Sequence, residues 1–128
     1  MQTSQQLVLI VDDHREAAEL IAEFLRECGF AALTASTGLD ALRLYDTQRP
    51  SLVITDQGLR DGISGSDLLR TLRRKYGQSV GRALFLTGSP ELVDCAAGDR
   101  VLEKPVGLDE LLAAVRAALE GSPAARYM

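Results

Sequence analysis

Apolar positions fall into two alternating patterns along the chain. Short uninterrupted runs, such as Leu7–Val11 and Leu52–Ile54, are typical of strands that are buried on both faces of a parallel sheet. Between these runs, apolar residues recur at every third or fourth position with charged residues between them, which predicts amphipathic helices. The predicted strands cover residues 7–11, 30–36, 52–55, 83–87 and 101–103. The predicted helices cover residues 17–28, 37–49, 64–76, 90–97 and 108–119.

Five strand-then-helix units predict an α/β fold. A strand, a crossover helix and a parallel strand connect with right-handed geometry, so successive units build an open parallel sheet with helices on both faces. The chain has 128 residues, which is the length of one domain. We expect a single domain with a core over residues 7–121 and a frayed tail over residues 122–128.

Charged and hydroxyl side chains, which can bind ligands or react, occur where the predicted strands end. They are, in chain order, Asp12 and Asp13, Asp56, Thr87, and Lys104. The carboxyl ends of parallel strands meet at one edge of a sheet, which is where open α/β sheets bind ligands. Each residue alone is better explained as a turn residue or a solvated lysine, but together they favour a functional site. Lys104 adds weight because the chain has only two lysines and twelve arginines.

The adjacent carboxylates of Asp12 and Asp13 indicate a bound cation. Asp13 and Glu16 have the spacing of a capping box, so helix capping is the simplest explanation of Asp13 alone. Capping does not explain two neighbouring carboxylates, whose repulsion is costly unless a cation lies between them. His14 follows the pair, and the simplest explanation for it is a solvated surface position without a metal role.

Charge and composition exclude several classes of protein. The net charge of −4 argues against nonspecific binding to nucleic acid, which requires a basic surface. No apolar run reaches the length of a membrane span, and the first residues lack the pattern of a signal peptide. Four basic residues at helical spacing are expected to form a solvated helix face: Arg70, Arg73, Arg74 and Lys75.

The two cysteines, Cys28 and Cys95, are far apart in sequence and belong to no Cys-x-x-Cys pair. Free thiols in a reducing cytoplasm are a better interpretation than a disulfide or a metal site.

Four separated motifs occur in order: Val11–Asp13, Ile54–Asp56, Leu86–Gly88 and Glu103–Pro105. With these motifs the chain resembles the receiver domains of two-component response regulators, which include the chemotaxis regulators. The resemblance extends over residues 7–119. It implies a flavodoxin-like, doubly wound sheet of five parallel strands in the order 2-1-3-4-5. A receiver domain within a hybrid sensor histidine kinase is one form that this resemblance allows.

The resemblance also implies how a phosphoryl group would be received. Asp56 would attack phosphorus and become an acyl phosphate. Lys104 would pair with one phosphoryl oxygen and Thr87 would donate a hydrogen bond to another.

A divalent cation is implied as the cofactor, because a phosphoryl group brings negative charge to a site that already holds carboxylates. Mg²⁺ is the expected ion, with Mn²⁺ as an alternative, since both take oxygen ligands. Asp13 and Asp56 would be direct ligands, Asp12 would act directly or through water, and the Gly58 backbone carbonyl would supply a further oxygen.

The implied partners are proteins. The phosphoryl donor would be a phosphohistidine of a histidine kinase or of a histidine phosphotransfer protein, and the output would be altered contact with a downstream protein that the sequence does not identify. A homodimer is left open, and direct contact with nucleic acid or a membrane is not expected. The protein would be a signalling phosphoacceptor that assists its own phosphorylation and dephosphorylation, rather than an enzyme. The alternative is an interaction module on the same fold that works without phosphorylation.

Three features depart from the common family pattern. Arg60 lies where proline often follows the acceptor, and Val101 lies where an aromatic residue often precedes the lysine. The interval from Thr87 to Lys104 is about one helical turn shorter than usual, so the helix over residues 90–97 should be short or irregular. Val101 and the short interval affect the expected output mechanism rather than phosphorylation itself.

Overall fold

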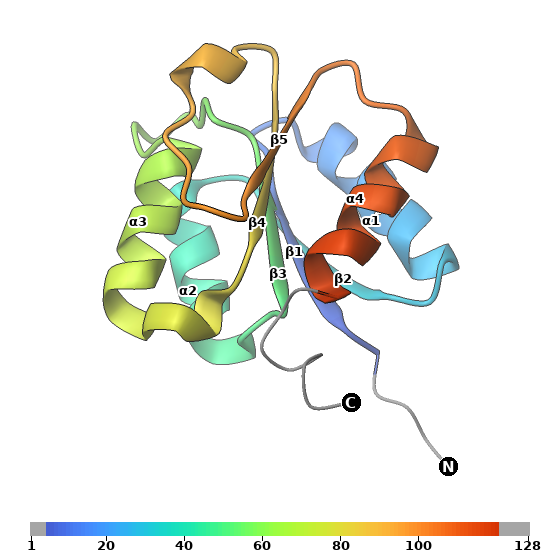
Figure 1. Cartoon of the computed structure of the whole chain (residues 1–128), viewed down its shortest axis with the longest axis horizontal. Helices are drawn as coiled ribbons and strands as arrows, with labels where there is room; N and C mark the ends of the chain where they lie inside the picture. The colour runs from blue at the N-terminus through green and yellow to red at the C-terminus, as the bar shows by residue number, and fades with distance from the viewer. Residues whose placement is uncertain (1–4, 121–128) are drawn as a thin grey trace.

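A five-stranded sheet lies between two layers of helices in the computed structural model, which describes residues 5–120 (Figure 1). The strands are β1 (Leu7–Val11), β2 (Ala31–Ala35), β3 (Leu52–Thr55), β4 (Ala83–Thr87) and β5 (Arg100–Glu103). The helices are α1 (Arg15–Glu27), α2 (Gly38–Gln48), α3 (Gly65–Tyr76) and α4 (Leu108–Glu120), with short 3-10 helices η1 (Gly77–Val80) and η2 (Pro90–Leu92). All strand pairs are parallel and their order is β2-β1-β3-β4-β5, which confirms the predicted fold class.

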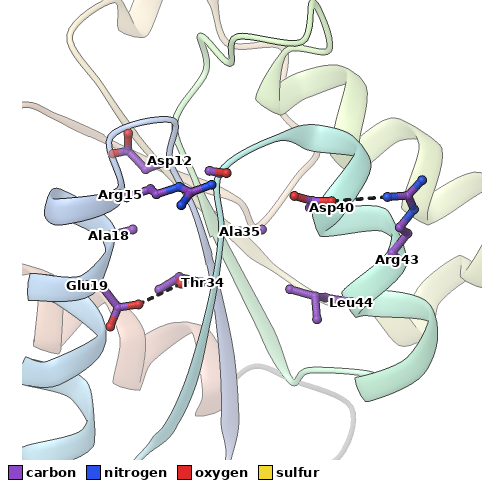
Figure 2. A pocket seen from close by; sticks show the side chains of 10 residues that line it. Asp12, Arg15, Ala18, Glu19, Thr34, Ala35, Asp40, Arg43 and Leu44 are labelled. Atoms are coloured by element: carbon purple, nitrogen blue, oxygen red, sulfur yellow. Dashed lines mark hydrogen bonds and ion pairs between the residues drawn. The ribbon is translucent and has the colours of Figure 1, made fainter.

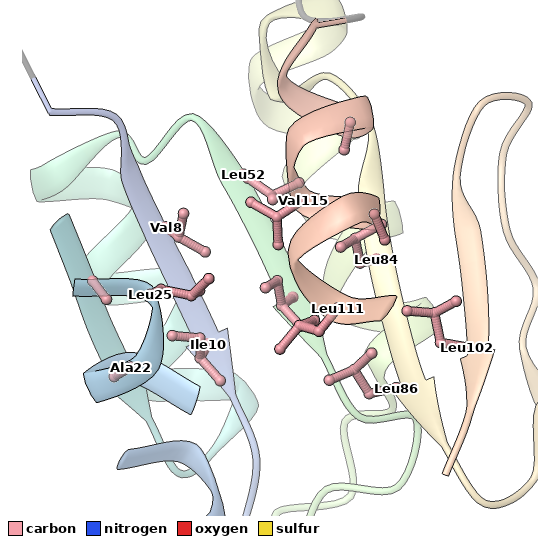
Figure 3. Packing of buried hydrophobic residues seen from close by; sticks show 14 of the residues in the cluster. Val8, Ile10, Ala22, Leu25, Leu52, Leu84, Leu86, Leu102, Leu111 and Val115 are labelled. Atoms are coloured by element: carbon pink, nitrogen blue, oxygen red, sulfur yellow. The ribbon is translucent and has the colours of Figure 1, made fainter. Parts of the chain in front are cut away.

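The uninterrupted apolar runs reflect burial on both faces of the sheet. In β1, Val8 and Ile10 pack toward α1 and α4, whereas Leu9 and Val11 pack toward α2 and α3. Figure 3 shows the first of these cores, in which Val115 of α4 lies over β3 and β4. Because successive side chains of a strand point to opposite faces, a strand covered on both sides needs apolar residues at every position.

The helix ends follow local chemistry. Ser64 and Asp67 form a reciprocal capping box at the start of α3. Arg49 ends α2 in a left-handed conformation with φ of 46°, directly before the proline that prevents the helix from continuing. The capping explanation of Asp13 is wrong, because the residue at the N-cap of α1 is His14 and its side chain makes no cap bond.

The connection from β4 to β5 has no α-helix in the part of the chain that the structure describes. The helix predicted over residues 90–97 is reduced to η2, and the remainder is irregular. This outcome agrees with the expectation of a short or irregular fourth helix. The label α4 therefore belongs to the last helix, which contributes to the same hydrophobic core as α1.

Asp99 holds this irregular connection in place. Its carboxylate is fully buried and accepts hydrogen bonds from the Arg73 guanidinium at 2.6 and 2.9 Å. It also accepts the backbone N–H groups of Ala83 at 2.8 Å and Ala96 at 2.9 Å. The prediction of a fully solvated basic face on α3 is therefore wrong for Arg73, whose side chain is only 25% exposed.

None of the helices within residues 5–120 is both long enough and apolar enough for a bilayer crossing. The predicted frayed tail, residues 122–128, lies outside the described residues, as does Gly121, the last residue of the predicted core.

Candidate functional site

The predicted acceptor, Asp56, lies directly beyond β3 at the carboxyl edge of the sheet. Its backbone N–H donates to the carbonyl of Val11 in the neighbouring strand at 3.0 Å, which fixes the point where the two strands end. Its carboxylate is 16% exposed and accepts the backbone N–H of Gln57 on Oδ1 at 2.6 Å. The second oxygen, Oδ2, faces Lys104. Asp56 is therefore anchored and still reachable from solvent.

Lys104 brings together two strand ends that are remote in sequence. Its Nζ lies 3.1 Å from Asp56 Oδ2 and 3.3 Å from Asp12 Oδ2. Partial burial by itself lowers the pKa of Lys104, but the hydrogen bonds and negative charges of Asp56 and Asp12 outweigh it and raise the pKa above its ordinary value. Lys104 therefore remains an ammonium at neutral pH.

The acidic pair, Asp12 and Asp13, lies at the end of β1, and the side chains of His14 and Arg60 lie beside it. Asp12 is 5% exposed, and its Oδ1 accepts the backbone N–H of His14 at 2.9 Å. The Nδ1 of His14 lies 3.2 Å from Asp13 Oδ1 and 3.4 Å from Asp12 Oδ1. Arg60 Nε lies 3.4 Å from Asp13 Oδ2. The His14 side chain is 68% exposed, as predicted, but it faces the acidic pair rather than only solvent.

Thr87 lies at the end of β4 and Gly58 in the loop after Asp56, both near this edge. Thr87 ends β4, is 3% exposed, and its hydroxyl accepts the backbone N–H of Ser89 at 3.0 Å. A hydroxyl that accepts one bond keeps its own hydrogen to donate. Gly58 lies in the loop after Asp56, and a Cβ at this position would meet open space. The assigned roles of Thr87 and of the Gly58 carbonyl stay predictions.

Gly65 allows the N-terminus of α3 to approach the acceptor. A Cβ at this position would collide with the backbone oxygen of Asp56, so only glycine permits the observed packing. The backbone N–H of Gly65 donates to the carbonyl of Gln57 at 2.8 Å, which closes the loop after β3.

The donor set fits a divalent cation. Asp12, Asp13 and His14 each offer a ligand atom within 4.8 Å of the other two. Asp12 and Asp56 share Lys104 as a hydrogen-bond partner, so their carboxylates face a common space. Carboxylate oxygens are the ligands that Mg²⁺ and Mn²⁺ take in proteins. The residues present can therefore hold the expected ion.

A cavity of about 540 Å³ borders the acidic edge from the side of β2 (Figure 2). It lies between α1, β2 and α2, and Asp12 forms part of its wall. Within it, Thr34 donates to Glu19 at 3.0 Å and Arg43 lies 3.5 Å from Asp40. Glu19 and Asp40 therefore have partners in the cavity wall, whereas the acceptor side of Asp12 brings two carboxylates and an ammonium together and is the better candidate for chemistry.

The strand order, the carboxylates at the carboxyl edge and the lysine between them together define the receiver class of signalling domains. The chain belongs to the response regulator receiver domain family, whose model matches residues 8–116. Two-component signal transduction is the function of this family.

Relatives of known name agree with this assignment. The chain is 38% identical over 121 residues to the transcriptional regulatory protein KdpE of Mycobacterium tuberculosis, covering 93% of this chain and 53% of that protein. It is 36% identical over 124 residues to the DNA-binding response regulator MtrA of Mycobacterium bovis, with coverages of 93% and 53%. The chain thus spans about half the length of these relatives.

Among solved structures, the chain is similar to a CheY-like response regulator receiver domain from Methylobacillus flagellatus. The sequence identity is 31%, the TM-score is 0.78, and the match covers 90% of this chain and 99% of that one. The signal receiver domain of an HD domain-containing protein from Pseudomonas fluorescens matches with a TM-score of 0.78 and 26% identity, covering 91% of this chain and 96% of that one.

Proposed function

We propose that Asp56 accepts a phosphoryl group from a phosphohistidine and that the resulting acyl phosphate switches protein contacts. The observation that supports this most strongly is the ammonium of Lys104, which lies 3.1 Å from Asp56 and 3.3 Å from Asp12. A charge-assisted hydrogen bond at this place can stabilise the negative charge on a transferring phosphoryl group.

The transfer step exchanges one bond for another. An oxygen of Asp56 forms a bond to phosphorus while the bond between phosphorus and the imidazole nitrogen of the donor breaks, and the donor histidine leaves as neutral imidazole after taking a proton. Lys104 moves its hydrogen bond from the carboxylate to a phosphoryl oxygen, and Thr87 donates to another. The Gln57 backbone N–H, 2.6 Å from Asp56 Oδ1, holds the nucleophile in place before transfer.

Asp12, Asp13 and Asp56, with the Gly58 carbonyl, would hold Mg²⁺. The bound ion would supply positive charge that offsets the negative charge gathered on the carboxylates and the phosphoryl oxygens. Arg60, 3.4 Å from Asp13, provides part of this charge from the protein itself.

The proposal is tested by incubating the protein with acetyl phosphate and Mg²⁺ and measuring its intact mass. We expect a mass gain of one phosphoryl group. We expect no gain when a chelator removes the metal before acetyl phosphate is added. An unchanged mass from a folded protein would favour the alternative, an interaction module that works without phosphorylation.

Removing the ammonium should slow the transfer. We expect Lys104→Ala to reduce the rate of phosphoryl uptake from acetyl phosphate on the order of 10²-fold, because a preorganised charge at the reacting group is lost. The matched control is Lys75→Ala, which removes the other lysine, an exposed residue paired with Asp46 at 3.4 Å. Rates are measured by mass at timed intervals, and equal rates for the two variants would contradict the role of Lys104.

Unlike the interpretation from sequence, which gave His14 no metal role, we add the imidazole nitrogen of His14 to the proposed ligands, because it lies within 4.8 Å of ligand oxygens of Asp12 and Asp13. Nitrogen ligands suit Mn²⁺ better than Mg²⁺, so Mn²⁺ should bind more tightly. We expect His14→Gln to reduce the preference for Mn²⁺ over Mg²⁺ on the order of tenfold, as measured by calorimetric titration with each metal. Electron spin echo spectroscopy of the Mn²⁺-loaded protein should show nitrogen coupling that the variant lacks.

Arg60→Gln is the control for charge alone. It removes a cation that faces Asp13 and should raise the affinity for both metals by the same factor. A preference for Mn²⁺ that is the same in the wild type and in His14→Gln would refute a ligand role for His14.

The partners and the cellular location also belong to this proposal. A histidine kinase or a histidine phosphotransfer protein would supply the phosphoryl group, and a further protein would read it. We place the domain in the cytoplasm, where Cys28 and Cys95 stay as the free thiols seen here. The open space beside Gly58 leaves a path for water, which supports hydrolysis of the acyl phosphate by the domain itself.

A further inference from the structure

Gln57, the residue after Asp56, is a buried polar residue whose side-chain nitrogen and oxygen are both hydrogen-bonded. Its exposure is 7%, and its side-chain amide would be costly to bury without hydrogen bonds. The amide nitrogen donates to the carbonyl of Leu92 at 2.7 Å. The amide oxygen accepts the backbone N–H of Ser66 at 3.0 Å and its hydroxyl at 2.9 Å. One side chain therefore joins the acceptor loop, the first turn of α3 and the segment after β4.

Ser66 adds a second connection between α3 and the segment after β4. Its hydroxyl donates to Gln57 and accepts the backbone N–H of Asp94 at 2.8 Å. Ser66 is itself 5% exposed. The two links, Gln57 to Leu92 and Ser66 to Asp94, fix residues 92–94 to the acceptor loop. We call this set of hydrogen bonds the Gln57 clamp.

The segment held by the clamp has little other regular structure. Past η2 it is irregular up to β5, and its far end is fixed by the buried carboxylate of Asp99. The side chain of Leu92 is 63% exposed. Residues 92–94 therefore combine an exposed surface with a short route to the acceptor, through a single side chain.

We infer that Gln57 is a positioning residue that fixes the Asp56 carboxylate and transmits its phosphorylation to residues 92–94. The inference rests on the proposed function, in which Asp56 is the phosphoacceptor. Once an oxygen of Asp56 is bonded to phosphorus, the carboxylate charge that the Gln57 backbone N–H meets at 2.6 Å is lost, and this bond weakens. The loop then shifts, and the buried amide of Gln57 moves with it. Residues 92–94 must follow or lose their partners, because buried polar groups are costly when unpaired.

The route suits this chain in particular. The connection between β4 and β5 lacks the helix that the family pattern predicts, and Val101 is a small apolar residue in β5. The Gln57 clamp supplies a direct link from the site to that connection, built from hydrogen bonds of 2.7 to 3.0 Å.

The test measures amide hydrogen exchange over residues 92–94, with and without acetyl phosphate and Mg²⁺. In the wild type we expect phosphorylation to raise exchange in this segment about tenfold, as for the loss of one or two hydrogen bonds. In Gln57→Leu, which keeps the volume but removes the side-chain hydrogen bonds of Gln57 to Leu92 and Ser66, exchange should be fast before phosphorylation and unchanged by it. Ser66→Ala removes the hydroxyl that accepts the Asp94 N–H and donates to Gln57, but it leaves the bonds of Gln57 to Leu92 and to the Ser66 backbone N–H in place. It should therefore reproduce the effect at the Asp94 amide alone. The control is Gln78→Leu, the same change at an exposed glutamine in η1, which should behave as the wild type.

Intact mass, recorded on the same samples, separates the two proposals. A wild type that gains a phosphoryl group without a change of exchange in residues 92–94 would overturn the role of the Gln57 clamp and leave the proposed function standing. The same holds if phosphorylated Gln57→Leu shows the wild-type change. A wild type that gains no mass would overturn the proposed function, and the inference with it.

Discussion

Asp56→Asn should remain folded and take up no phosphoryl group from acetyl phosphate. Asparagine has the shape of aspartate, and its side-chain oxygen can still accept the Gln57 N–H that Asp56 accepts at 2.6 Å. The amide, however, is a poor nucleophile and cannot form the acyl phosphate. We expect the mass gain of the wild type to vanish completely, with an unchanged circular dichroism spectrum.

Asp61→Asn is the matched control for this result. Asp61 lies in the same loop, and its carboxylate accepts the backbone N–H of Leu39 at 3.0 Å, which lowers the pKa of Asp61. It belongs to a structural contact with α2 and should be phosphorylated at the wild-type rate. A mass gain that persists in Asp56→Asn would move the acceptor to another residue, of which Asp12 and Asp13 are the nearest candidates.

Asp99→Ala should lower the free energy of unfolding by about 3–5 kcal/mol, the range found when one partner of a buried ion pair is removed. The substitution leaves the Arg73 guanidinium, which is only 25% exposed, without its carboxylate. It also leaves the N–H groups of Ala83 and Ala96 without their acceptor. Urea denaturation followed by circular dichroism measures the loss.

Asp94→Ala removes an exposed aspartate–arginine pair and so shows how much of the effect of Asp99→Ala comes from burial. Asp94 also pairs with an arginine of α3, Arg70, at 2.9 Å, but its side chain is 77% exposed. Such a pair contributes about 0–1 kcal/mol, so this variant should be nearly as stable as the wild type. If Asp99→Ala fails to fold, Asp99→Asn, which keeps part of the hydrogen bonding, gives the measurable intermediate. Equal losses for Asp99→Ala and Asp94→Ala would contradict the structural role of Asp99.

The sheet could be predicted from strong local patterns in the sequence. The contact of Lys104 with Asp12 and Asp56 could then be predicted from the order of the strands. A run such as Leu7–Val11 has no polar residue, so burial on both faces is the only arrangement that suits it. Once the strands are parallel, their carboxyl ends share an edge, and the contact of Lys104 with Asp12 and Asp56 follows from topology.

The contacts of the loops could not be predicted, because they depend on residues that carry no periodic signal. Gln57 follows a strand end, where a glutamine is usually solvated, and only the fold brings it to Leu92, 35 positions away. Asp99 and Arg73 are 26 positions apart, and neither has a neighbour in sequence that marks it as buried. The helix expected over residues 90–97 is reduced to η2, and the segment bonds to Gln57 and Ser66 at Leu92 and Asp94.

The side chains that lie beside Asp12 and Asp13 could not be predicted either. His14 has the sequence context of a surface residue, and its exposure agrees, yet its ring nitrogen lies 3.2 Å from Asp13. Arg60 was noted only as a departure from the family pattern, and the structure places it 3.4 Å from the same carboxylate. Side-chain direction at the end of a strand is set by the loops around it, which sequence patterns leave open.

The position of the acyl phosphate can be read directly by chemical trapping. Borohydride reduces an acyl phosphate to an alcohol, so a phosphorylated aspartate becomes homoserine and is found by tandem mass spectrometry of peptides. After treatment with acetyl phosphate and Mg²⁺, we predict homoserine at position 56 and at no other aspartate. Homoserine at position 12 or 13, or none in a protein that has gained a phosphoryl group, would contradict the account.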